Sequence, residues 1–154
     1  MRHLKYVLAA HGRLGCAMLE ATAMILGISV YQKAACVDLQ EGESLENFYD
    51  KLSSIVDGDT VIVTDLFGGT PSRAALMLLQ EARVKAVVTG LNMPMLLEML
   101  MNDEGVNNLP EFLQRVRQAA REGVRVFAGS DLAELPDRSV QKAEKGILQR
   151  FLRR

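Results

Sequence analysis

A histidine ends the first apolar run of the chain, and glycines follow it closely. The run "YVLAA" stops at His11, with Gly12 next and Gly15 three residues further on. The imidazole of histidine is a nucleophile near neutral pH, so it needs no separate base before it attacks a phosphoryl group. Because Gly12 places no side chain beside the ring, a partner protein could approach it in line. We therefore expect His11 to carry a phosphoryl group and Gly12 to help accommodate it.

The stretch "DLFGGTPSRAA", residues 65–75, contains the groups that such a histidine would need. The carboxylate of Asp65 could hold one ring nitrogen, fix the tautomer and stabilise the positive charge that develops as the N–P bond forms. Gly69 frees the loop, and the Thr70 hydroxyl and nearby backbone N–H groups at the start of a helix could bind an anion. We expect His11 and Asp65 to be catalytic and Gly12, Gly69 and Thr70 to bind the phosphoryl group.

Other interpretations of these residues stay open at the level of sequence. His11 could simply end a strand, and glycines are common at strand-to-helix turns that bind nothing. A metal site at His11 and Asp65 has no apparent third ligand, and no cofactor is indicated. A nucleotide-binding loop is excluded, because neither G-x-x-x-x-G-K-[ST] nor G-x-G-x-x-G can be read here. The other histidine, His3, is expected at the surface.

The elements that would position these residues alternate between strands and helices. Short, mostly apolar, Val-rich runs predict strands at 5–10, 34–39, 60–65 and 85–90, with a possible short strand at 124–127. Helical patterns are predicted at 15–27, 44–56, 71–82, 93–102 and 109–123. This alternation indicates a three-layer α/β domain with a mostly parallel sheet. With a flavodoxin-like strand order of 2-1-3-4, His11 and Asp65 would meet at the switch point where ligands bind.

Residue types at the helix ends support these boundaries. Ser44 and Thr70 are predicted to be N-caps, and Gly27 is predicted to be a C-cap. Pro71 and Pro110 suit the first turns of their helices.

Composition limits the class of protein. The 154 residues, 49% hydrophobic and 24% charged, predict one globular domain, and the net charge of -1 gives no reason to expect nucleic acid as a partner. Cys16 and Cys36 lack metal-like spacing and are expected to be reduced thiols in the cytoplasm. No apolar run approaches the roughly 18 residues needed to span a bilayer, and the start of the chain lacks a signal peptide's apolar segment. Residues 138–154 hold six basic residues and one glutamate, which suggests an appended basic tail or helix.

Three motifs, taken together, resemble the enzyme IIA components of the mannose, fructose, sorbose and N-acetylgalactosamine branch of the bacterial phosphoenolpyruvate-dependent sugar phosphotransferase system. They are "HGRLG" at 11–15, "DLFGGTPSRAA" at 65–75 and "GLNMPMLLEML" at 90–100. Their order and spacing resemble the family over roughly residues 4–128. A related branch, the phosphocarrier subunit of dihydroxyacetone kinase, shares this fold, but "FGGTP" favours the sugar branch.

The resemblance implies a cytoplasmic phosphocarrier that accepts a phosphoryl group from HPr on His11 and passes it to enzyme IIB, which serves the membrane components IIC and IID. It implies that Asp65 holds the second ring nitrogen, that Thr70 contacts the phosphoryl group and that Asn92, after the fourth strand, helps to shape the site. Asn92 could instead be only a turn residue before a proline. The family also implies a homodimer, often formed by exchange of a last antiparallel strand, for which 124–127 is the candidate.

Two departures from the family pattern stand out. Leu66 occupies a position where some members have a small polar residue, and the basic tail matches nothing in the family's core. We expect an enzyme IIA-like domain at 1–129 followed by the tail at 130–154. The alternative function is a non-catalytic flavodoxin-like regulatory module that binds a partner without phosphoryl transfer.

Overall fold

A computed structural model describes residues 3–103 and 106–132 of the chain. A short helix, α6 (Gly129–Leu132), ends the described part. The remainder of the predicted basic tail, residues 133–154, lies outside the described residues, so the expectation of a tail or helix there stays a prediction.

Four parallel strands form the central sheet in the order β2-β1-β3-β4, which confirms the predicted 2-1-3-4 arrangement. The strands are β1 (Lys5–His11), β2 (Ala34–Leu39), β3 (Thr60–Thr64) and β4 (Ala86–Thr89). The inner strands β1 and β3 are buried along almost their whole length. Continuous apolar runs suit these positions because helices cover both faces of a parallel sheet.

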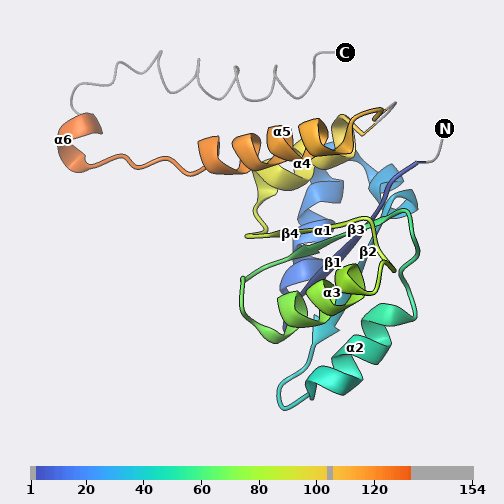
Figure 1. Cartoon of the computed structure of the whole chain (residues 1–154). Helices are drawn as coiled ribbons and strands as arrows, with labels where there is room; N and C mark the ends of the chain where they lie inside the picture. Colours follow the sequence, from blue (N-terminus) through green and yellow to red (C-terminus); the bar gives the residue numbers. More distant parts are fainter. Residues whose placement is uncertain (1–2, 104–105, 133–154) are drawn as a thin grey trace.

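Helices cover the two faces of the sheet, as Figure 1 shows. One apolar core joins the sheet to α1 (Leu14–Leu26), α4 (Met93–Met101) and α5 (Leu109–Glu122), and the other joins it to α2 (Leu45–Ser53) and α3 (Thr70–Gln80). Alternation along the strands divides the side chains between these cores: Leu8 and Val63 face the first, and Val7 and Ile62 face the second. A short 3₁₀ helix, η1 (Ile28–Gln32), links α1 to β2 and was not predicted.

The helix ends agree with most of the predicted caps. The Ser44 hydroxyl accepts a hydrogen bond from the Asn47 N–H at 3.1 Å, and Gly27 follows α1 with φ of 94°. The prediction for Thr70 was wrong, because Gly69 is the N-cap of α3 and Thr70 is the first helical residue. Gly69 fills the cap position without a side-chain hydrogen bond, which leaves the Thr70 hydroxyl outside the capping geometry.

The expected antiparallel edge strand is not seen among the described residues. After Gly123 the chain runs away from the sheet toward α6, so it does not pair with β4 (Figure 1). The apolar side chains of Val124, Val126 and Phe127 are consequently exposed. The alternating apolar residues of this stretch predict a strand, but a strand forms only when it pairs with a neighbouring strand. In the single chain this stretch does not lie beside one.

The two cysteines form a disulfide, which corrects the expectation of free thiols. Cys16 lies in the first turn of α1, and Cys36 lies on the face of β2 that α1 covers, with their Cα atoms 5.2 Å apart. Nothing in their spacing along the sequence could reveal this pairing, because it depends on how α1 crosses β2. The bond ties the first turn of α1, at a residue four positions beyond Gly12, to β2.

None of the described helices is both long enough and apolar enough to cross a membrane.

Candidate functional site

The candidate site lies at the carboxyl edge of the two inner strands. His11 is the last residue of β1, and Asp65 directly follows β3. The strands lie side by side, with Ala9 of β1 opposite Thr64 of β3, so the topology brings the histidine and the carboxylate together as predicted.

His11 and Asp65 make two contacts with each other. The ring Nδ1 lies 2.9 Å from Asp65 Oδ2, and the His11 backbone N–H donates to the same oxygen at 3.0 Å. A carboxylate accepts hydrogen bonds, so this contact assigns the proton to Nδ1 and leaves the Nε2 lone pair free. The His11 side chain is 48% exposed, whereas that of Asp65 is 10% exposed. The arrangement leaves the Nε2 lone pair of a half-exposed ring free and holds the Nδ1 side of the ring against Asp65.

Three N–H groups surround the Asp65 carboxylate. Its second oxygen, Oδ1, accepts from the Leu66 N–H at 2.9 Å, in addition to the two contacts from His11. Partial burial raises the pKa of the Asp65 carboxyl, but the hydrogen bonds from His11 and Leu66 outweigh that effect and hold the pKa below its ordinary value. Asp65 therefore stays ionised and can stabilise positive charge on the ring.

Gly69 lies against the edge of the imidazole that carries Nε2. A Cβ added to Gly69 would stand 2.7 Å from His11 Cε1 and 3.4 Å from Nε2. The φ of Gly69 is an ordinary -74°, so its backbone conformation does not require glycine. The close approach of the backbone to the ring does. Because Gly69 is the N-cap of α3, the ring edge faces the amino end of that helix, where an anion is favoured.

Ser72 is a site residue that the sequence did not reveal. Its side chain is fully buried in the first turn of α3, where Oγ accepts from the Gly68 N–H at 2.9 Å and donates to the Gly69 carbonyl at 3.0 Å. A serine three residues after the second glycine of the pair could have suggested a bridge across the turn. The direction of its side chain became visible only with the helix in place.

The remaining predicted residues differ in how they relate to the ring. Gly12 has φ of 53° and donates its N–H to the Leu39 carbonyl at 2.8 Å, and no atom lies within 4 Å of the place where a Cβ would stand. The space beside it is open, as predicted. Thr70 begins α3 beside Gly69 and is partly exposed.

Asn92 is occupied in the fold. Its Oδ1 accepts from the Met95 N–H at 3.0 Å as the N-cap of α4, and its Nδ2 donates to the Ala120 carbonyl at 3.0 Å. These contacts join α4 to α5 and involve neither His11 nor Asp65. They favour the interpretation of Asn92 as a capping residue.

Exposed apolar side chains follow the site residues closely in the sequence. Leu14, three residues after His11, is 44% exposed, and Leu66 and Phe67, which directly follow Asp65, are 61% and 74% exposed. Large apolar groups at a protein surface often mark contacts with other proteins. These three residues therefore form an exposed apolar rim suited to contact with another protein.

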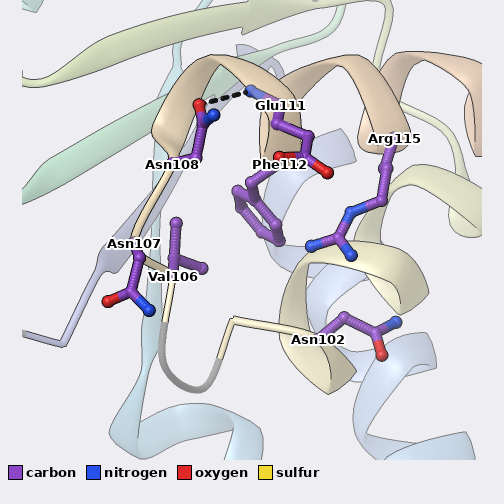
Figure 2. Close-up of a pocket in the computed structure, with 7 residues that line it drawn as sticks. All are labelled: Asn102, Val106, Asn107, Asn108, Glu111, Phe112 and Arg115. Carbon is purple, nitrogen blue, oxygen red and sulfur yellow. Dashed lines mark hydrogen bonds between the residues drawn. The ribbon is translucent and has the colours of Figure 1, made fainter.

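Two cavities lie away from the imidazole. One of about 320 Å³ runs along β4, with Val88, Gly90, Arg117 and Arg121 among its lining residues. The other, of about 200 Å³, lies where α4 connects to α5 (Figure 2). There the Arg115 guanidinium lies 5.9 Å from the centre of the Phe112 ring, and the Asn108 side chain caps the N–H of Glu111. Neither of these two cavities includes His11 or Asp65 among its lining residues.

Comparisons with known proteins agree on one family. Residues 5–117 match the family model described as the PTS system fructose IIA component. The sorbose-specific EIIA component of the PTS from Lacticaseibacillus casei is 31% identical over 121 residues, a match that covers 75% of this chain and 86% of that protein. The fructose-specific EIIA component from Bacillus subtilis is 26% identical over 130 residues, covering 77% and 88%.

A solved structure supports the same relationship. The mannose/sorbose specific IIA subunit of the phosphotransferase system from Enterococcus faecalis superposes with a TM-score of 0.74 at 28% identity. The superposition covers 88% of this chain and 98% of that one. The similarity in fold thus extends over most of this chain.

Proposed function

Because this chain belongs to the enzyme IIA family of the mannose, fructose and sorbose branch of the bacterial sugar phosphotransferase system, we propose that it carries a phosphoryl group on His11 between HPr and enzyme IIB. The observation that supports this most directly is the hydrogen-bonded pair of His11 Nδ1 and Asp65, which leaves Nε2 as the exposed nucleophile. The proposed catalytic residues are His11 and Asp65.

In the proposed transfer, His11 Nε2 attacks the phosphorus of phospho-HPr. A new N–P bond forms at Nε2 as the N–P bond of the donor breaks, and the electron pair of that bond returns to the donor nitrogen. The His11 ring keeps its proton on Nδ1 and becomes positively charged, which the Asp65 carboxylate stabilises. The reverse sequence of bond changes delivers the phosphoryl group to the histidine of enzyme IIB.

We propose that the turn around Gly69 receives the phosphoryl oxygens. Gly69 allows the backbone to approach Nε2, and Thr70 adds a hydroxyl at the start of α3. The amino end of a helix and a neighbouring donor favour an anion. Gly12 leaves the other side open for in-line approach, and the rim formed by Leu14, Leu66 and Phe67 is the proposed contact surface for HPr and enzyme IIB.

We also propose that residues 1–129 form the phosphocarrier domain of a homodimer. β4 is an edge strand with a cavity along it, and the apolar residues Val124, Val126 and Phe127 are exposed beyond α5. An exposed edge and an unpaired apolar segment favour addition of the segment from a second copy. The proposed localisation is the cytoplasm, where the carrier would supply the membrane components IIC and IID through enzyme IIB.

Incubation with phosphoenolpyruvate, enzyme I and HPr tests this function. We expect intact-mass spectrometry to detect one added phosphoryl group. That group should be lost at low pH, as in a phosphoramidate. In a separate sample at neutral pH, it should be lost on addition of enzyme IIB. The variant His11→Ala is the control and should gain none. A wild-type chain that folds but gains no phosphoryl group would instead support the non-catalytic interaction module.

A further inference from the structure

The hydroxyl of Ser72 closes the glycine turn beside His11. It is fully buried, accepts from the Gly68 N–H at 2.9 Å and donates to the Gly69 carbonyl at 3.0 Å. One hydroxyl carries one donor and accepts through its lone pairs, so both of its roles are used within this turn. The Gly69 carbonyl also accepts from the Arg73 N–H at 3.0 Å, whereas the Gly68 N–H donates to Ser72.

That turn needs a brace because two adjacent glycines have large backbone freedom. Gly68 has φ of 90°, a conformation that glycine adopts readily but does not hold by itself. The turn also contains a backbone hydrogen bond from the Gly69 N–H to the Leu66 carbonyl, at 3.3 Å. The two Ser72 bonds are shorter than this one and, with the Arg73 N–H, hold Gly69 in place; only Ser72 also ties Gly68 to the helix.

The position of Gly69 in turn sets the space for the imidazole. A Cβ on Gly69 would stand 2.7 Å from His11 Cε1, so the backbone of the turn is the wall on that edge of the ring. Asp65 contacts the next atom of the ring, Nδ1, at 2.9 Å. Two neighbouring ring atoms are therefore restrained, one by a carboxylate and the other by a braced glycine.

We infer that Ser72 is a positioning residue for His11. The Ser72 hydroxyl orients the His11 ring by holding the Gly68–Gly69 turn in place. Ser72 touches neither the ring nor the proposed phosphoryl position, so it acts through Gly69. The orientation of the ring is a property of the resting protein, whereas the effect on transfer rests on the proposed phosphocarrier function.

The variant Ser72→Ala removes the brace at a place where the fold can tolerate it. Gly68 is exposed, so water can replace the lost acceptor and the protein should remain folded. A less restrained turn lets the ring sample more orientations and fewer productive ones. We expect the rate of phosphoryl transfer at saturating phospho-HPr to fall about tenfold with little change in KM, on the scale by which small misplacements slow reactions.

Thr60→Val is the matched control. Thr60 is also buried, and its Oγ1 accepts from the Asp57 N–H at 3.0 Å in a turn at the opposite edge of the sheet. This variant removes a buried hydroxyl that bridges a turn without touching the site. Both variants and the wild type are compared by circular dichroism and thermal unfolding.

The first measurement is the nuclear magnetic resonance spectrum of the histidine ring nitrogens in the unphosphorylated protein. The chain has only two histidines, so exposed His3 is an internal reference. We expect Ser72→Ala to shift or broaden the His11 signals and leave those of His3 unchanged, while Thr60→Val moves neither. Unchanged His11 signals in folded Ser72→Ala would overturn the inference.

The second measurement is single-turnover transfer from phospho-HPr. If the wild type takes no phosphoryl group, the proposed function fails, and the ring signals still decide the role of Ser72. If wild type and Ser72→Ala transfer at the same rate, Ser72 has no positioning role in the reaction. If Ser72→Ala does not fold, Ser72→Cys, which retains a weaker donor and acceptor, is measured in the same two ways. His11 signals and a rate equal to the wild type in that variant would contradict the inference.

Discussion

The lack of a side chain at Gly69 leaves the space that the His11 ring occupies. Its backbone angles suit any residue, so Gly69→Ala should fold normally, but the new Cβ would stand 2.7 Å from His11 Cε1 and push the ring away. We expect phosphoryl transfer to slow by about tenfold or more. Gly58→Ala, whose Cβ would meet no atom within 4 Å, is the control and should transfer at the wild-type rate. Equal rates for both variants in rapid-quench assays would show that the ring does not depend on this contact.

Asp65 is expected to control the rate more than the fold. Asp65→Asn keeps the shape of the side chain, but its amide can present a donor to Nδ1 and favour the wrong tautomer of His11. It also removes the negative charge that stabilises the ring during transfer. We expect transfer from phospho-HPr to slow by roughly 10²-fold, the scale for loss of one preorganised electrostatic partner. Rapid-quench kinetics measures this, with circular dichroism as the control for folding, and a wild-type rate would contradict the role.

The same carboxylate should make stability depend on pH. Burial raises the pKa of Asp65 but its hydrogen bonds lower it further, so the folded value lies below the ordinary 3.8 of an aspartate. A group with a depressed folded pKa stabilises the protein above its unfolded pKa, and that stabilisation is lost as pH falls through the folded pKa. We expect the difference in unfolding free energy between wild type and Asp65→Asn to shrink below about pH 4. Urea unfolding at pH 7 and at pH 3 measures it, and a constant difference would refute the linkage.

At the scale of elements, the disulfide joins α1 to β2 close to the site. It closes a loop with a sequence separation of 20 residues. Cross-linking a loop of this size restricts the unfolded chain and stabilises the protein by about 3 kcal/mol. We therefore expect a reducing agent to lower the unfolding free energy of the wild type by that order, and to leave Cys36→Ser unaffected. Denaturant unfolding with and without reductant tests this, and identical curves for the oxidised and reduced wild type would contradict it.

The order of strands and helices could be predicted because each type has its own apolar period. The strand at 34–39 was predicted to the residue, the strands at 5–10 and 60–65 differ by one residue at one end, and the strand at 85–90 differs by one residue at both ends. The helix predicted at 44–56 ends at Ser53, one residue after the buried Leu52. The disulfide and the Thr70 position could not be predicted, since both depend on where α1 and α3 cross the sheet.

The candidate site was partly predictable for the same reason. His11 and Asp65 each end a strand, and the topology that follows from short apolar runs brings such ends together. Ser72 was missed because its role comes from the direction of a hydroxyl inside the first turn of α3. Asn92 was placed at the correct edge of the sheet, but both ends of its amide serve the packing of α4 and α5.

At the scale of the whole molecule, the open edge of β4 and the apolar segment after α5 predict self-association. A chain shortened after Gly123 lacks Val124, Val126 and Phe127, which are exposed in the single chain, and should be mostly monomeric. The full chain should be a dimer at micromolar concentration. Light scattering coupled to size-exclusion chromatography measures both, and a monomeric full chain would exclude the dimer.

The three N–H groups around Asp65 bear on how long a phosphorylated carrier would last in water. The ring is half exposed, so water reaches the place where a partner's histidine would attack. Hydrolysis is fastest when a base removes a proton from the attacking water. Both oxygens of Asp65 are engaged by His11 and Leu66, and its lowered pKa makes it a poor base. The contacts that orient His11 thus also keep Asp65 from acting as a base toward water. Hydrolysis of the phosphohistidine would therefore be slow although the group itself is not buried.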